Sequence, residues 1–171
     1  IGLGRGLKRP TFNYTVDAGE FVIGAPNVRI ENLRFIATVT DVTTAVDVEA
    51  AATDVEIVNC AFEVETAATD EFAASITAAV GAARGLIKGC FISQGLGGAV
   101  YGISLATPTG WVINDNYIMG DFTTACVGTI TGAGVLCQMH NNVMVNGQPG
   151  ALGTVAVFTQ SAAGTWTVGG N

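Results

Sequence analysis

One short pattern returns six times between Asn27 and Asn171. Each copy has two apolar residues flanking a single residue, then a small polar residue or glycine, then a second apolar step. The second apolar residues of the copies are Ile30, Ile57, Ile87, Ile113, Met139 and Val168. Their spacing of about 26 to 30 residues is typical of repeat architectures, in which each unit packs on its neighbours. The sequence therefore predicts a stack of equivalent coils.

Two residues after each aligned position, every copy has Asn, Asp or Gly. The column consists of Asn32, Asn59, Gly89, Asp115, Asn141 and Gly170. These residue types enter the left-handed backbone region at the lowest cost. We therefore expect each coil to turn sharply at this point, which ends a strand.

The next column contains three asparagines in successive copies. Its members are Leu33, Cys60, Cys90, Asn116, Asn142 and Asn171. Side chains that repeat once per coil stack at the strand spacing of about 4.8 Å. Asn116, Asn142 and Asn171 are therefore predicted to form an amide ladder, in which each side-chain NH₂ meets a carbonyl of the next coil.

The residues before the turn alternate with a period of two, which is typical of a strand. The alternation places Val28, Ile30, Val55 and Ile57 inward, and Arg29, Glu31, Asp54, Glu56 and Val58 outward. After the turn, a second apolar column consists of Phe35, Phe62, Ile92, Ile118 and Met144. A third strand per coil is expected in segments 45–50, 74–79, 101–106, 127–131 and 154–159. The alanine-rich segment 71–84 has a helical alternative, but Ser75, Ile76, Thr77 and Gly81 favour a strand.

With three short strands per coil and an Asn column, the chain resembles right-handed parallel β-helix proteins of the pectate-lyase-like type. The opening IGLGRGLKRPTFNY, followed by NVRIENLRF, further resembles β-helix proteins of bacteriophages and prophages, such as tail spikes and capsid decoration proteins. This resemblance implies an all-β solenoid of about six coils. It does not fix the function, because the architecture carries lyases, hydrolases, adhesins and structural proteins.

Composition agrees with a single domain over residues 1–171, with 1–26 as an entry coil and 27–171 as regular coils. Hydrophobic residues make up 49% of the chain and charged residues 12%, alongside 23 glycines. A net charge of −7 argues against nucleic acid or an anionic membrane as partner. No apolar run is long enough to span a bilayer. Because Ile1 opens the chain and Asn171 falls within a coil motif, we expect an incomplete first coil and a partner or continuation at the C-terminus.

The charged residues are confined to the first part of the chain. All seven basic and all 14 acidic residues lie at or before Asp121. Interfaces are depleted in charge at their centres. We therefore expect region 122–171 to pack on copies of the same chain, in a homotrimer such as the resemblance implies. The alternative is a surface rich in Thr, Asn, Gln and Gly that is neutral by chance.

The opposite pattern occurs over residues 41–71, which contain acids and no basic residue. The acids are Asp41, Asp47, Glu49, Asp54, Glu56, Glu63, Glu65, Asp70 and Glu71. We expect an acidic face here, which is solvated, binds calcium between coils, or docks on a basic protein. Arg29 beneath Glu56 is expected to form an ion pair between coils, which contributes about 0 to 1 kcal/mol when exposed.

The four cysteines are expected to be reduced and buried. Cys60 and Cys90 share one column in adjacent coils, where parallel Cβ vectors suit a disulfide poorly. Cys137 shares the first inward column with Val28, Val55 and Trp111, and Cys126 lies in an apolar strand. No CxxC or Cys/His spacing indicates a metal site, and no cofactor is expected.

Catalytic signals are weak. The GLGRG string at residues 2–6 lacks the lysine–serine pair of a phosphate loop, and we expect it to form a turn. The weak catalytic candidates are Lys88, Asp121 and His140, with Asp115 and Tyr117 beside them. Asp115 occupies the turn column, and His140 is expected to lie outward beside Asn114 and Lys88.

Two functions remain open at the level of sequence. The first is a non-enzymatic structural protein of a virion, which is assembled in the bacterial host cytoplasm and contacts capsid or other virion proteins. The second is a polysaccharide-degrading tail-spike fragment, a lyase or glycosidase with its groove between subunits. A bacterial surface adhesin is a third reading, which the absence of an export signal weakens.

Overall fold

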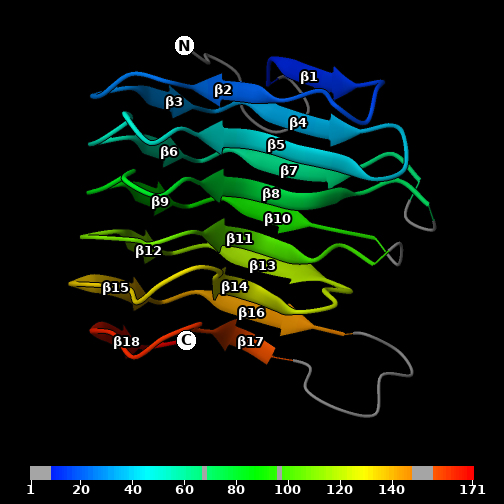
Figure 1. The fold of residues 1–171 in the computed structure, drawn as a ribbon. Coiled ribbons are helices and arrows are strands. Elements are labelled where there is room, and N and C mark those ends of the chain that lie inside the picture. The colour runs from blue at the N-terminus through cyan, green and yellow to red at the C-terminus, as the bar shows by residue number, and fades with distance from the viewer. Residues whose placement is uncertain (1–8, 67–68, 96–97, 148–155) are drawn as a thin grey trace.

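The repeated coils stack into a parallel β-solenoid of about five turns, with three strands per turn (Figure 1). The computed structural model describes residues 9–66, 69–95, 98–147 and 156–171. The turn expected at residues 2–6 lies outside these ranges. The 18 strands form three six-stranded parallel sheets, and the described residues contain no helix. The expected all-β solenoid is confirmed, and segment 71–84 forms a strand at Phe72–Ala78 rather than a helix.

Each sheet takes one strand from every coil, and the sheets are called A, B and C here. Sheet A contains β1 (Thr11–Tyr14), β4 (Arg34–Ala37), β7 (Ala61–Val64), β10 (Phe91–Ser93), β13 (Tyr117–Gly120) and β16 (Val143–Asn146). Sheet B contains β2 (Phe21–Ile23), β5 (Val42–Val48), β8 (Phe72–Ala78), β11 (Tyr101–Leu105), β14 (Ala125–Thr129) and β17 (Ala156–Thr159). Sheet C contains β3 (Arg29–Glu31), β6 (Glu56–Val58), β9 (Leu86–Lys88), β12 (Val112–Asn114), β15 (Cys137–His140) and β18 (Trp166–Gly169). Segment 1–26 thus supplies β1 and β2 to the same sheets that the regular coils extend.

The pairing register follows the columns of the sequence. In sheet C the aligned residues Ile30, Ile57, Ile87, Ile113, Met139 and Val168 are directly paired from coil to coil. In sheet A the second column runs Phe35, Phe62, Ile92, Ile118 and Met144, as expected. Because like residues lie over one another, a single core of buried side chains runs along the solenoid.

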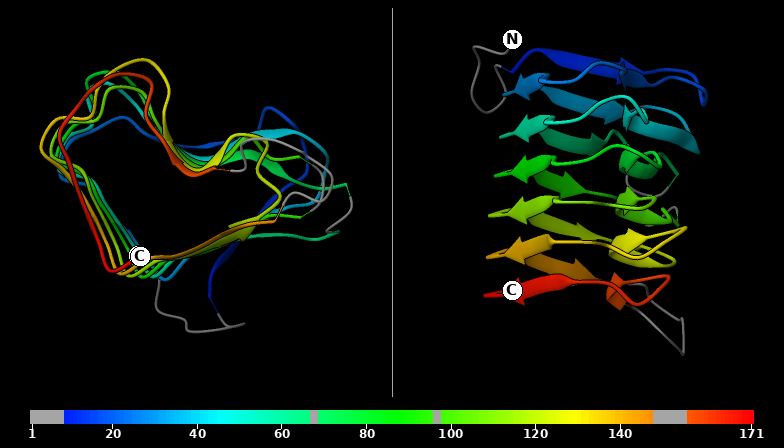
Figure 2. Two further views of the ribbon diagram at one scale, coloured as in Figure 1. Left: turned by 90° about the horizontal axis from the view of Figure 1, so that it is seen from below. Right: turned by 60° about the vertical axis from the view of Figure 1, so that its left-hand side comes forward.

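The turn between sheets C and A is the most regular part of the coil. All six residues of the Asn/Asp/Gly column have positive φ, between 51° and 66°. Seen along the axis, the coils superpose closely at this turn and spread apart in the connections from sheet A to sheet B (Figure 2). The turn therefore has the same backbone conformation in every coil, whereas the A-to-B connections vary in length.

A second left-handed column lies at the entry to sheet C, and the sequence analysis missed it. Its members are Asn27 (φ 59°), Asp54 (φ 57°), Arg84 (φ 55°), Gly110 (φ 65°) and Leu136 (φ 55°). The column has no uniform residue type, so residue identity does not reveal it. Arg84 and Leu136 hold a conformation that costs an L-residue with a Cβ about 1 kcal/mol or more.

The first inward column of sheet C contains a glycine that the sequence analysis omitted. The pairings place Gly85 between Val55 and Trp111, with Cys137 and Trp166 beyond. A Cβ on Gly85 would lie 2.4 Å from the ring of Trp111. The glycine therefore leaves the space that the fully buried indole ring occupies in the next coil.

One residue on the outward side of sheet C is buried nonetheless. Val58 was expected to be outward, but it is only 6% exposed. It pairs with Glu31 and Lys88 in register, on the side opposite to Ile57, and it is not part of the core cluster. Period-two alternation predicts the side of the sheet on which a side chain lies, whereas its exposure to solvent also depends on the neighbouring side chains.

Candidate functional site

The catalytic candidates are divided between two regions of the coil. Lys88 and His140 end strands β9 and β15, and they share one outward column of sheet C with Asn114. Asp121 follows β13, at the opposite end of sheet A from the turn that holds Asp115. The four residues of β13 separate Asp121 from this turn, and a strand of that length spans about 13 Å. The structure therefore does not bring Asp121 together with Lys88 and His140.

Lys88 and Asp115 form an exposed ion pair across adjacent coils. The Lys88 Nζ atom lies 3.7 Å from Asp115 Oδ2, and the two side chains are 50% and 44% exposed. The Asn141 side chain donates a 3.4 Å hydrogen bond to the other Asp115 oxygen. Asp115 thus has a left-handed backbone conformation, and its side chain contacts Lys88 in the preceding coil and Asn141 in the following coil. These features indicate that Asp115 stabilises the turn.

Asp121 belongs to a group of buried carboxyls in the A-to-B connections. Its side chain is 8% exposed, and its Oδ1 atom has no hydrogen-bond partner among the described residues. The same holds for Oε2 of Glu71, which is 4% exposed. Burial, together with the carboxyls of Asp41 and Asp121, raises the pKa of Glu71 to about 7. Glu71 therefore keeps its proton to a higher pH than an exposed glutamate does.

Glu71 cannot be recognised as a site residue from the sequence. It occurs in a run of nine acids with no spacing that distinguishes it, and its surroundings come from loops in three different coils. Asp121 also lines a cavity of about 210 Å³, whose other walls are Gln94, Gly95, Met119, Gly120, Val145 and Gly147. Among the described residues of this lining, Asp121 is the only ionisable group.

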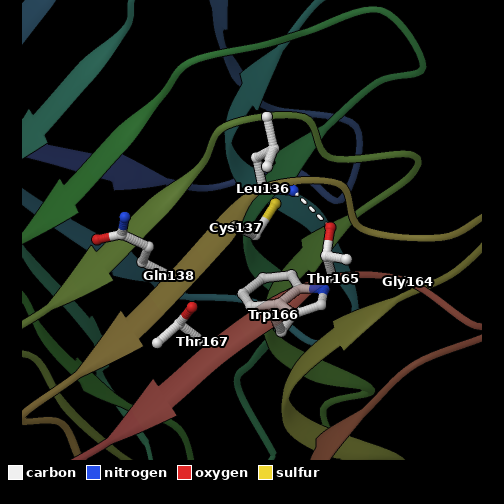
Figure 3. Close-up of a pocket in the computed structure, with 7 residues that line it drawn as sticks. All are labelled: Leu136, Cys137, Gln138, Gly164, Thr165, Trp166 and Thr167. Atoms are coloured by element: carbon white, nitrogen blue, oxygen red, sulfur yellow. Dashed lines mark hydrogen bonds between the residues drawn. The ribbon is translucent and has the colours of Figure 1, made fainter.

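A larger depression of about 460 Å³ lies across β15 and β18 (Figure 3). Leu136, Cys137, Gln138, Gly164, Thr165, Trp166 and Thr167 line it. The Leu136 amide donates a 2.9 Å hydrogen bond to Thr165 Oγ1, which joins the two coils at its edge. Cys137 is the only ionisable side chain in the lining, and burial raises the pKa of its thiol. This lining offers no acid–base pair for hydrolysis or elimination.

The asparagine column forms a continuous hydrogen-bonded ladder. Asn116 Nδ2 donates to Asn142 Oδ1 at 2.9 Å, and Asn142 Nδ2 donates to Asn171 Oδ1 at 3.0 Å. Each asparagine oxygen also accepts a hydrogen bond from the backbone N–H of the column residue in the preceding coil. For example, Cys90 N donates to Asn116 Oδ1 at 2.8 Å. Asn116 and Asn142 are 2% and 1% exposed. Their amides therefore satisfy one another within an apolar stack and serve the fold.

The cysteines are free and buried, as expected. Burial raises the pKa of Cys126 to about 12 and also raises the pKa of Cys90. These two thiols are therefore poor nucleophiles and poor metal ligands, whereas a hydrogen bond with the Cys90 thiol lowers the pKa of Cys60. Within the described ranges, no group of three or more His, Cys, Asp or Glu side chains is arranged to hold a metal ion.

The acids of residues 41–71 do not form one face. Glu56 and Asp54 pair with Arg29 and Arg84 at the outside of sheet C and its entry, and Glu63 pairs with Arg34 on sheet A. Asp47 lies in sheet B and accepts a 2.6 Å hydrogen bond from Thr77. The expected Arg29–Glu56 ion pair is present, but the expected acidic face was wrong. Because this run follows the chain around a whole coil, its charges point in every direction around the axis.

Comparison with known proteins returned no match to the chain among protein-family models, curated proteins or solved structures. Among the described residues there is also no helix long and apolar enough to cross a bilayer. The fold alone therefore defines the class, a parallel β-solenoid with three strands per turn.

Proposed function

We propose that the chain is a non-enzymatic structural protein of a bacteriophage or prophage virion. In this role a trimer of β-solenoids decorates or reinforces the capsid, or projects from the particle as a spike. The observation that carries the non-enzymatic part is the separation of Asp121 from Lys88 and His140, because acid–base catalysis needs its groups within hydrogen-bond reach of one substrate. The virion assignment rests on the resemblance of the opening segment and the coil motif to phage β-helix proteins.

The solenoid has the properties that a structural role requires. Three parallel sheets satisfy the backbone from coil to coil, and the core is continuous along the axis. Region 122–171 contains no Asp, Glu, Lys or Arg. A region without these charged residues at one end of a rod is suited to packing against sister chains, because burying it avoids the desolvation penalty of charged side chains.

The mass of the protein in solution tests the assembly. Sedimentation at micromolar concentration is expected to give three times the chain mass, and limited proteolysis is expected to leave the solenoid intact. A stable monomer at that concentration would contradict the proposed trimer. Electron microscopy of phage particles with a labelled copy of the chain tests the virion assignment, and label absent from the particles would contradict it.

A second function, glycan cleavage by a tail-spike fragment, is favoured by one observation. Asp121 lines a cavity, and the nearby Glu71 has a pKa of about 7, as a general acid requires. The test is release of reducing ends or unsaturated sugars from host capsular polysaccharide. Activity that is lost in Asp121→Asn plus His140→Ala, or in Glu71→Gln, would overturn the structural proposal.

A further inference from the structure

An uncharged, partly apolar surface covers the outer side of sheet A on strands β10, β13 and β16. Because Ile92, Ile118 and Met144 point into the core, the alternate residues of these strands point outward. These outward residues, called the apolar face here, are Phe91, Ser93, Tyr117, Met119, Val143 and Val145. Phe91 and Tyr117 stack with ring centroids 5.6 Å apart and planes 12° from parallel. Val143 and Val145 are 51% and 47% exposed.

The same side of sheet A is charged at its other end. The outward column that ends in Phe91, Tyr117 and Val143 begins with Thr11, Arg34 and Ala61. Arg34 forms an ion pair with Glu63 of the neighbouring column, and both side chains are only 27–28% exposed. The outer side of sheet A thus has a charged half at β4 and β7 and an uncharged half at β10 to β16.

We propose that the apolar face packs against the apolar faces of the other copies of this chain around the axis of the proposed trimer, with the solenoid axes parallel and the coils in register. The inference rests on the proposed homo-oligomer and assigns the surface and orientation through which it forms. It moves the centre of contact from region 122–171 as a whole to sheet A, where Phe91, Tyr117 and Met119 precede that region.

The charge pattern selects both the occupant and its orientation. In the parallel arrangement, the apolar face meets the uncharged surface of the neighbouring copies, and the Arg34–Glu63 ion pair of each copy lies at the level of the same ion pair in its neighbours. An antiparallel pair would bury the Arg34–Glu63 ion pair under Phe91, Tyr117 and Val143, and the desolvation of both charges would oppose it. A second copy therefore supplies a matching surface along the full length of the sheet.

The outer side of sheet C on the same coils lacks this character. Its outward residues on β9, β12 and β15 are Leu86, Lys88, Val112, Asn114, Gln138 and His140. Four of these side chains carry hydrogen-bonding groups that water can satisfy. Sheet C therefore provides matched control positions on the same coils.

The first experiment compares two lysine substitutions in the full chain. Val143→Lys places a charge within the apolar face on β16, whereas Gln138→Lys places one on the outer side of sheet C. We expect Val143→Lys to weaken self-association by about 100-fold or more, and Gln138→Lys to leave it unchanged. Sedimentation velocity over a concentration series measures both, and circular dichroism establishes that each variant is folded.

The second experiment measures orientation and does not depend on the lysine variants. Thr11 and Val143 lie at opposite ends of one outward column, and the four native cysteines are buried. Under mild oxidation, Thr11→Cys alone and Val143→Cys alone should each form disulfide-linked dimers. A mixture of the two should give only like-with-like dimers, whereas the wild type should give none.

The outcomes separate the two proposals. A monomeric wild type would overturn both the proposed assembly and this inference. An oligomer that persists in folded Val143→Lys, or that dissociates in Gln138→Lys instead, would overturn the apolar face alone. Cross-linking of Thr11→Cys only to Val143→Cys would overturn the parallel orientation.

Discussion

At the scale of single residues, the stability of this solenoid depends on side chains that repeat once per coil. Asn142 is the central rung of the amide ladder, where its Oδ1 accepts from both the backbone and the side chain of Asn116. Replacing Asn142 with Leu leaves these donors and the Ile113 carbonyl without their partner. We expect the free energy of unfolding to fall by about 2–4 kcal/mol, measured by chemical denaturation. An unfolding free energy equal to that of the wild type would contradict the structural role of the ladder.

The left-handed turns make a matched pair of predictions at Asn141 and Leu136. Asn141 has a φ of 54°, and Gly89 and Gly170 occupy the same column in other coils. Asn141→Gly should therefore be nearly neutral, whereas Asn141→Val should cost about 1–2 kcal/mol. Leu136 has a φ of 55° and is 72% exposed. Leu136→Asn should raise stability by about 0.5–1 kcal/mol, and a loss of stability there would show that Leu136 makes contacts that offset its strain.

Gly85 is predicted to be intolerant of even one methyl group. Its Cβ would collide with the Trp111 ring at 2.4 Å, and Trp111 is held by a 3.1 Å hydrogen bond from its indole Nε1 to the Ala82 carbonyl. Gly85→Ala should lower the free energy of unfolding by about 1–3 kcal/mol. In the Trp111→Leu background, the same substitution should cost much less. Equal costs in both backgrounds would contradict this packing.

At the scale of elements, the strands and tight turns were predictable, and the A-to-B connections were not. The aligned columns around Ile113 and Phe62 are set by local alternation and by the coil period, both of which the sequence displays. The need for glycine at position 85 and the raised pKa of Glu71 depend on side chains of other coils. Glu71 interacts electrostatically with Asp41 and, more weakly, with Asp121, and the three acids lie at different distances along the chain from the aligned column of their own coils, so no repeat in the sequence aligns them.

These connections should also make stability depend on pH. The pKa of Glu71 is raised from 4.5 to about 7, so the folded state holds a proton that the unfolded state releases. The stabilisation is fully present below about pH 4.5 and is lost as pH rises through about 7. Glu71→Gln should remove this part of the slope of unfolding free energy between pH 5 and pH 8, about 1–3 kcal/mol after allowance for solvent screening. Glu65→Gln, at an exposed acid of the same connection, should retain it.

At the scale of the whole molecule, all coils share one hydrophobic core, so a disruptive substitution in one coil should destabilise the whole solenoid. Ile113 is fully buried between Ile87 and Met139. Ile113→Asp places an unpaired charge in that column, at a cost of several kcal/mol, which rivals the stability of a domain. We expect no soluble, protease-resistant protein from this variant. The conservative Ile113→Val should remain soluble, with a loss of about 1 kcal/mol.

The most direct test of the account is a set of methyl–methyl contacts in protein labelled at isoleucine methyl groups. In-register parallel stacking predicts nuclear Overhauser effects along three separate series of isoleucines. These are Ile30–Ile57–Ile87–Ile113 in sheet C, Ile92–Ile118 in sheet A, and Ile76–Ile103 in sheet B. Contacts between these neighbours, each a full coil apart along the chain, are the result that the stacked coils require. Their absence, or a pattern in which Ile30 contacts Ile113 directly, would contradict the parallel solenoid.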